Sequence, residues 1–428
     1  MTKQQKSYVL PIIVMIALFG MISFVTGLQN PMGIIVKNQF GASNFMSQLG
    51  NAANFLAYLF MGIPSGLLLQ RVGYKKTALI AVAVGFIGVG IQYLSGSFAS
   101  FPVYLAGAFV SGFSMCMLNA VVNPMLNTLG GGGKKGNQLI QIGGSFNSLN
   151  ATIVPVLVGY LIGNASQATI KDANPALFIA MGVFAFVFVV LLIVNIPEPS
   201  LARQEENNTS VAETITAPLS YKHFALGAIA IFVYVGVEVG IPNFSNLFMT
   251  SSAAEGGLGI NPTIAGSVVG TYWFLMLIGR LLGGIFGGKV SSKAMLSTTS
   301  GLAALLVVLA IFSSTDTLVK MPVFMSDISL GLAEVPITFM FLTLCGFCTS
   351  IMWGSIFNLA VEGLGKHTEA ASGIFMMLVV GGGIFPLIQG GIADSISYTA
   401  SFWLVFAGLI YLLYYALIGS KVTKRADN

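Results

Sequence analysis

The chain has 428 residues, of which 55% are hydrophobic and 8% are charged, and its mean hydropathy is +0.87. Soluble domains carry roughly 25% charged residues, so this composition excludes a soluble globular protein and indicates an integral protein of the lipid bilayer. The formal net charge of +5 gives no reason to expect a nucleic-acid partner, because in a membrane protein the positions of the basic residues carry the information.

The hydrophobic residues form continuous runs of about 20 to 28 residues, which predict membrane-spanning helices and not the alternating strands of a β-barrel. The first run follows a short basic segment and is too long for the core of a signal peptide, so we expect a retained first helix. We predict twelve spans, at about 9–36, 44–70, 77–96, 100–127, 139–163, 174–196, 223–250, 262–287, 294–314, 334–361, 368–393 and 398–420.

A polar stretch between the sixth and seventh runs is rich in Glu, Asn, Thr and Pro, as expected of a linker. It divides the chain into an N-terminal bundle of six helices (1–196), a linker (197–222) and a C-terminal bundle of six helices (223–428). Fifteen of the nineteen Lys and Arg residues fall on the side that holds this linker and both termini. The positive-inside rule therefore predicts a multi-pass protein with both termini in the cytoplasm.

The two halves also share short sequence patterns in the same order. The segments 66–75 and 284–293 match, Asn123 corresponds to Asn358, and 155–159 corresponds to 386–390. Two six-helix halves with parallel internal symmetry place a substrate site at their interface, near the membrane midplane. We therefore expect two pseudo-symmetric bundles in an all-α membrane protein.

The first 171 residues contain no Asp or Glu, and their helices carry carboxamides instead. Asn119 and Asn123, four residues apart, share one helix face. Carboxamides both donate and accept hydrogen bonds, which suits a neutral polyol; the alternative is that they only join helices to one another. The candidate substrate-binding residues of this half are Gln29, Asn30, Asn119, Asn123, Gln141 and Asn147.

Glu238 is the one carboxylate near the middle of an apolar run. A charge at that depth costs at least ~2.5–3.5 kcal/mol, so such residues are usually functional. Gly236, Gly240 and Pro242 flank it and are expected to loosen the helix there.

Arg280 lies in the next apolar run. Glu238 is roughly 22 Å, and Arg280 roughly 10 Å, from the cytoplasmic end of its helix. From this difference we expect no ion pair between them, and we expect Arg280 to extend toward the inner face. An unpaired Glu238 in a half-hydrated cavity is then expected to exchange a proton during transport. The alternative is a protonated Glu238 that only binds substrate.

The other candidates of the second half are amides and aromatic residues. Aromatic faces stack on the apolar faces of sugar rings, while polar groups fix orientation. Tyr and Trp are also common at membrane interfaces, but Trp353 lies well inside its run. The remaining candidate substrate-binding residues are Asn243, Asn246, Tyr272, Trp353 and Asn358.

No residue set for catalysis or metal binding can be assembled. Cys345 and Cys348 have C-x-x-C spacing, but no further Cys or His lies near enough in the sequence to complete a metal site. His223 and His367 fall at loop edges. We therefore expect no enzyme, no metal and no cofactor, and we interpret the cysteines as small buried residues.

Several motifs resemble those of a known group: Asn123-Pro124, Ser145-Phe146-Asn147-Ser148, Tyr234-Val235-Gly236, Ile278-Gly279-Arg280 and Gly381-Gly382-Gly383-Ile384. Over nearly its whole length the chain is similar to the major facilitator superfamily and, within it, to the fucose–galactose–glucose:proton symporters. This resemblance implies the two-bundle fold, alternating access, a bacterial inner (plasma) membrane and a monosaccharide such as fucose, galactose or glucose. It also implies that Asn147 lies near the sugar.

One departure from this family concerns the proton. Its typical member relies on a carboxylate in the first helix and another in the fourth, and the corresponding positions here are Ile34 and Asn119. At the position of Glu238 the typical member has a neutral carboxamide, so we expect Glu238 to take over proton coupling here. We expect the protein to be a monomeric sugar transporter. The alternatives are a facilitative carrier without ion coupling, an exporter of drugs or lipophiles, and a transporter-like nutrient sensor.

Overall fold

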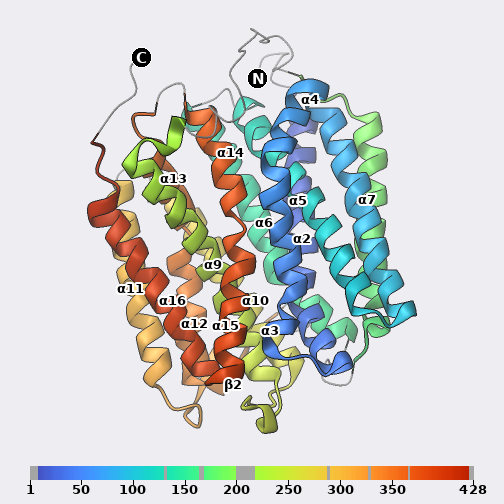
Figure 1. Cartoon of the computed structure of the whole chain (residues 1–428), viewed down its shortest axis with the longest axis vertical. Coiled ribbons are helices and arrows are strands. Elements are labelled where there is room, and N and C mark those ends of the chain that lie inside the picture. Colours follow the sequence, from blue (N-terminus) through green and yellow to red (C-terminus); the bar gives the residue numbers. More distant parts are fainter. Residues whose placement is uncertain are drawn as a thin grey trace.

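The computed structural model of the chain describes residues 8–129, 133–162, 168–198, 217–286, 290–325, 329–364 and 367–423. Its long helices lie side by side along the long axis of the molecule (Figure 1). Within the described ranges, eleven helical segments are long and apolar enough to cross a membrane, as the hydrophobic runs predict. Helix α6 (Gly133–Ile162) has 30 residues and is richer in amides, and with it the set is consistent with twelve spans.

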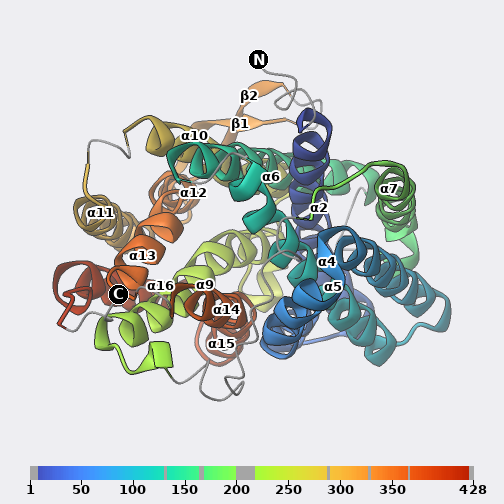
Figure 2. The same cartoon turned by 90° about the horizontal axis from the view of Figure 1, so that it is seen from above.

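Viewed along the long axis, the helices form two groups (Figure 2). The first group, the N-terminal bundle, consists of α2 (Val9–Phe40), the short α3 (Asn44–Ser47), α4 (Leu49–Phe98), α5 (Phe101–Leu129), α6, the 3-10 turn η1 (Ile170–Ala173) and α7 (Asn174–Ile193). The second group, the C-terminal bundle, consists of α9 (Lys222–Thr250), the 3-10 turn η2 (Ala253–Glu255), α10 (Pro262–Phe286), α11 (Ser292–Phe312), α12 (Ile337–Thr349), α13 (Met352–Val361), α14 (Thr368–Leu378), α15 (Gly381–Ser395), α16 (Tyr398–Tyr414) and the π-turn η4 (Tyr415–Gly419).

Helix α4 contains two spans joined by a turn at Gly73. The backbone of Gly73 has φ 83° and ψ 175°, a conformation that favours glycine. A Cβ atom at this position would also collide with the carboxylate of Glu198. That carboxylate accepts hydrogen bonds from the backbone amides of Tyr74 and Lys75, at 2.7 and 2.9 Å. The turn between the second and third spans is therefore fastened to the segment that follows the sixth.

A two-stranded hairpin lies between α11 and α12, where the hydrophobic runs predict no strand and the tenth predicted span begins at about 334. Strand β1 (Leu318–Phe324) pairs antiparallel with β2 (Leu330–Pro336). Its inner-face residues Met321, Val323, Ala333 and Val335 are buried, while the outer-face residues between them are exposed. The hairpin and α3 lie at one end of the molecule, drawn at the bottom of Figure 1. We call this the hairpin end and the opposite end the linker end.

Pro242 lies inside α9, which continues from Lys222 to Thr250. Proline has no backbone N–H, and the carbonyl group of Glu238, four residues earlier, therefore lacks its helical donor. The hydroxyl group of Tyr272 in α10 donates to that carbonyl at 3.1 Å. The same hydroxyl lies 3.1 Å from Oγ1 of Thr349 in α12. A neighbouring helix thus satisfies the backbone carbonyl that the proline frees, as a proline inside a membrane helix requires.

Candidate functional site

Glu238 and Arg280 form an ion pair inside the C-terminal bundle. Nη2 of Arg280 lies 3.3 Å from Oε1 of Glu238, and the two side chains are 19% and 13% exposed, respectively. The prediction that these residues do not pair is therefore wrong. The depth estimate considered only backbone positions, whereas side chains on a helix lean toward its N-terminus. Because α9 and α10 run in opposite directions, these two side chains lean toward each other.

Arg280 also contacts the N-terminal bundle, so the prediction that it extends toward the inner face is wrong as well. Its Nη1 donates to Oγ of Ser148 at 2.7 Å and to the carbonyl oxygen of Gly144 at 3.1 Å. Both acceptors belong to α6. The guanidinium of Arg280 therefore holds a carboxylate of its own bundle and two neutral oxygens of the other bundle at the same time.

Aromatic residues surround this pair. Tyr234 lies one turn before Glu238, is fully buried, and has its hydroxyl near the carboxyl group. The ring of Trp353 in α13 is 6.2 Å from the ring of Tyr234, and Trp353 itself is half-buried. Tyr272 is buried with its hydroxyl engaged by α9 and α12. The structure thus places Tyr234 beside the Glu238 side chain, Tyr272 against its backbone carbonyl, and Trp353 against Tyr234.

Three candidate carboxamides of the N-terminal bundle make intramolecular hydrogen bonds. The amide NH₂ group of Asn119 donates to the Tyr58 hydroxyl at 3.1 Å and to the Met115 carbonyl at 3.0 Å. Asn123 donates to the carbonyl of Asn119 at 3.0 Å. Asn147 donates to the carbonyl of Phe19 in α2 at 2.9 Å. All three side chains are only partly buried, so they combine a structural bond with some accessibility.

The remaining candidates are distributed over a wider region. Gln29 is 2% exposed, and its Oε1 accepts a hydrogen bond from the Tyr104 hydroxyl at 3.0 Å. Asn243 and Asn246 are buried in α9, whereas Asn358 is exposed near the end of α13. The side chains of Asn30 and Gln141 lie outside the described part of the structure.

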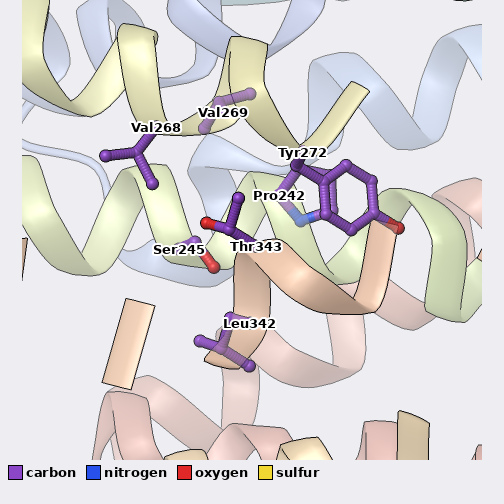
Figure 3. Close-up of a pocket in the computed structure, with 7 residues that line it drawn as sticks. All are labelled: Pro242, Ser245, Val268, Val269, Tyr272, Leu342 and Thr343. Carbon is purple, nitrogen blue, oxygen red and sulfur yellow. The ribbon is translucent and has the colours of Figure 1, made fainter. Parts of the chain in front are cut away.

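A small void adjoins Pro242 (Figure 3). It is lined by Pro242, Ser245, Val268, Val269, Tyr272, Leu342 and Thr343. All these residues belong to α9, α10 and α12, and the void leaves no room for a water molecule. It is therefore a packing gap within one bundle, and we do not assign it to the substrate.

Three buried polar residues, Ser148, Lys37 and Gln389, are not among the predicted site residues. Ser148 belongs to a motif, but nothing in the sequence links it to Arg280. Lys37 is a basic residue at the end of the first span, and the structure buries it to 6% exposure. Gln389 lies in α15 against Gly240, is fully buried, and has no hydrogen-bond partner for either amide atom within the described residues. The burial of each of these residues depends on packing between segments that are far apart in the sequence.

A family model described as Major Facilitator Superfamily matches residues 13–378. The chain belongs to the major facilitator superfamily. A glucose/galactose transporter of Brucella abortus is 30% identical over 422 residues, which cover 98% of this chain and 96% of that protein. An L-fucose-proton symporter of Escherichia coli is 22% identical over 413 residues, which cover 92% of this chain and 89% of that protein.

A crystal structure of the fucose:proton symporter of E. coli superposes with a TM-score of 0.70 and 18% identity, covering 97% of this chain and 100% of that one. At this identity the match concerns the fold. Together with the family model, it confirms the predicted major facilitator fold with its many membrane-spanning helices. Membership of this superfamily also confirms that the chain is a membrane carrier and not an enzyme.

Proposed function

We propose that this protein is a secondary transporter of a neutral monosaccharide, a hexose or deoxyhexose such as glucose, galactose or fucose, working by alternating access. The observation that carries the proposal is the setting of Glu238, which lies beside Tyr234 and is paired with Arg280 where that residue contacts α6. The ring of Trp353 lies against Tyr234. Aromatic faces and a few polar groups are what sugar sites use. The names of the relatives, glucose/galactose transporter and L-fucose-proton symporter, support the same substrate class.

Sugar binding is assigned to both bundles. Partly buried amides of the N-terminal bundle supply donors and acceptors for hydroxyl groups, and Trp353 supplies an apolar face. Glu238 accepts from a hydroxyl group of the sugar. Gln29, Asn30, Asn119, Asn123, Gln141, Asn147, Asn243, Asn246, Tyr272 and Asn358 complete the proposed set.

Proton coupling is assigned to Glu238 through its pair with Arg280. A carboxylate held permanently in an ion pair exchanges no proton, so coupling requires the pair to open during the cycle. Glu238 and Arg280 move together in one bundle, while Ser148 and Gly144 belong to the other. Rocking of the bundles therefore changes the contacts of Arg280, and protonation of Glu238 removes its attraction for the guanidinium.

The second candidate is a facilitative carrier with no ion coupling. The ion pair itself favours it, because Glu238 already has a cationic partner. The absence of acids from the first 171 residues also favours it, since coupling in the family relies on carboxylates there. In either case we place the protein in a bacterial inner membrane as a monomer, with the linker end in the cytoplasm, as the distribution of basic residues supports.

Exchange of labelled sugar in liposomes tests the function without requiring any ion gradient. Purified protein is assayed for counterflow with a panel of hexoses, deoxyhexoses and pentoses. We expect exchange of at least one hexose or deoxyhexose, and a loss of most of this exchange in Trp353→Ala. Trp403→Ala is the matched control, because Trp403 is 44% exposed on α16. The absence of exchange for every sugar, or an equal loss in both variants, would contradict the proposal.

A further inference from the structure

Lys37, near the C-terminal end of α2, is a buried cation at the hairpin end. Its Nζ donates to Oε2 of Glu255 at 2.8 Å, to Oγ of Ser251 at 3.0 Å and to the hydroxyl group of Tyr398 at 3.1 Å. All three acceptors belong to the C-terminal bundle. A buried ammonium without partners is strongly unfavourable. Lys37 therefore ties the end of α2 to three separate positions on the other bundle.

Neighbouring contacts strengthen the same junction. The hydroxyl group of Tyr398 donates to Oδ1 of Asn44 at 2.7 Å. The carboxylate of Asp394, at the end of α15, accepts hydrogen bonds from the backbone amides of Asn44 and Phe45, both at 2.9 Å. The segment from Lys37 to Phe45 is thus held by side chains from three elements of the C-terminal bundle.

The ion pair of this junction differs from the other ion pairs of the described residues. Of the three ion pairs found there, Lys37–Glu255 is the one that joins the two bundles. Glu238–Arg280 and Lys320–Glu334 both lie within the C-terminal half. A carrier that works by alternating access separates its bundles at one end at a time. Opening of the hairpin end must therefore break every contact of Lys37.

We propose that Lys37, Glu255, Ser251, Tyr398, Asn44 and Asp394 form a latch that keeps the hairpin end closed and makes this the resting state. The sequence orientation places that end outside the cell, so the resting carrier is closed to the outside. Release of the latch is a required step each time the carrier turns outward. The proposal depends on alternating access but not on which sugar is carried.

The latch is tested by the labelling rate of a cysteine introduced at the buried contact between the two bundles. Ala52 is buried in α4 and lies against Gly383 of α15, where the bundles meet. The three native cysteines are buried, so their background labelling is low. Ala52→Cys is labelled with a membrane-impermeant maleimide from the outside of right-side-out vesicles. Lys37→Met is expected to raise the labelling rate about tenfold, which lies within the usual range for the effect of one site on a conformational equilibrium.

Lys320→Met is the matched control. It removes a lysine from the same end and breaks the Lys320–Glu334 pair, whose side chains are 70% and 62% exposed and lie within the hairpin. We expect it to leave the labelling rate unchanged. Glu255→Gln and Tyr398→Phe are milder changes that keep the test valid where Lys37→Met fails to fold, and each is expected to raise the rate by a smaller factor.

Labelling at the parental rate in all three latch variants, or an equal increase in Lys320→Met, would overturn the proposal. The readout needs no sugar. A negative result in the exchange assay would therefore count against the proposed substrate and not against the latch.

Discussion

Asn51 in α4 donates a hydrogen bond of 2.9 Å to the backbone carbonyl of Gly382 in α15, from one bundle to the other. Pro386 makes that carbonyl available, because proline lacks the N–H group that would bond to it within the helix. Gly382 and Gly383 permit the close approach, since a Cβ atom at Gly383 would press against Ala52 of α4. Pro386, Gly382 and Gly383 thus leave an unpaired carbonyl on a closely packed face of α15, and the side-chain amide of Asn51 in α4 donates to it.

Asn51→Leu should weaken the closed state at the hairpin end. The carbonyl of Gly382 would lose its donor while still buried, which costs about 1–3 kcal/mol in that state alone. We expect labelling of Ala52→Cys from outside to rise about fivefold or more, the factor that corresponds to about 1 kcal/mol.

Asn54→Ala is the control for Asn51. Asn54 lies on the same helix, but its amide donates to the carbonyl of Ala108 in α5, within the N-terminal bundle, at 3.2 Å. We expect this variant to lower the unfolding temperature without changing the labelling rate. Equal effects of both substitutions on labelling would show that the Asn51 bond does not govern closure.

A double-mutant cycle tests whether the Tyr272 hydroxyl compensates for the N–H group that Pro242 lacks. Tyr272→Phe leaves the carbonyl of Glu238 without a donor and should destabilise the protein by about 1 kcal/mol. Pro242→Ala restores an N–H group that bonds to the same carbonyl within α9. The cost of Tyr272→Phe should therefore be smaller in the Pro242→Ala background, as measured by thermal unfolding of purified protein. An identical cost in both backgrounds would refute this account of α9.

The membrane spans were predictable because each depends on one contiguous property of the chain. A run of apolar residues such as 174–196 must form a helix in lipid, where all backbone polar groups have to bond internally. The structure has α7 at Asn174–Ile193. The interpretation of Cys345 and Cys348 as small buried residues is also confirmed.

The candidate site was less predictable because its contacts depend on side-chain direction and on packing between distant segments. Glu238 was identified from its position alone, but its partner was missed because backbone depth ignores the lean of both side chains toward each other. The contacts of Lys37 join residues more than two hundred positions apart. No local pattern in the sequence contains that information.

Arg280→Met should destabilise the protein more than the double variant Glu238→Gln/Arg280→Met. The single change leaves a carboxylate inside the bundle without its cation, and the double change leaves a neutral amide. With side chains 13–19% exposed, we expect a difference of about 1–3 kcal/mol, between the exposed and buried limits for ion pairs. Thermal unfolding of the purified variants measures it. A double variant less stable than Arg280→Met would show that the pair has little influence on stability.

Transport by Glu238→Gln in liposomes tests the central claim most directly, because the substitution keeps the shape of the side chain and removes its proton exchange. Glu334→Gln, at an exposed acid of the hairpin, is the control. We predict that Glu238→Gln retains sugar counterflow within about threefold, since the amide oxygen of Gln still accepts a hydrogen bond from the sugar hydroxyl, but loses accumulation driven by an inward proton gradient. Unchanged proton-driven accumulation in Glu238→Gln would contradict the account.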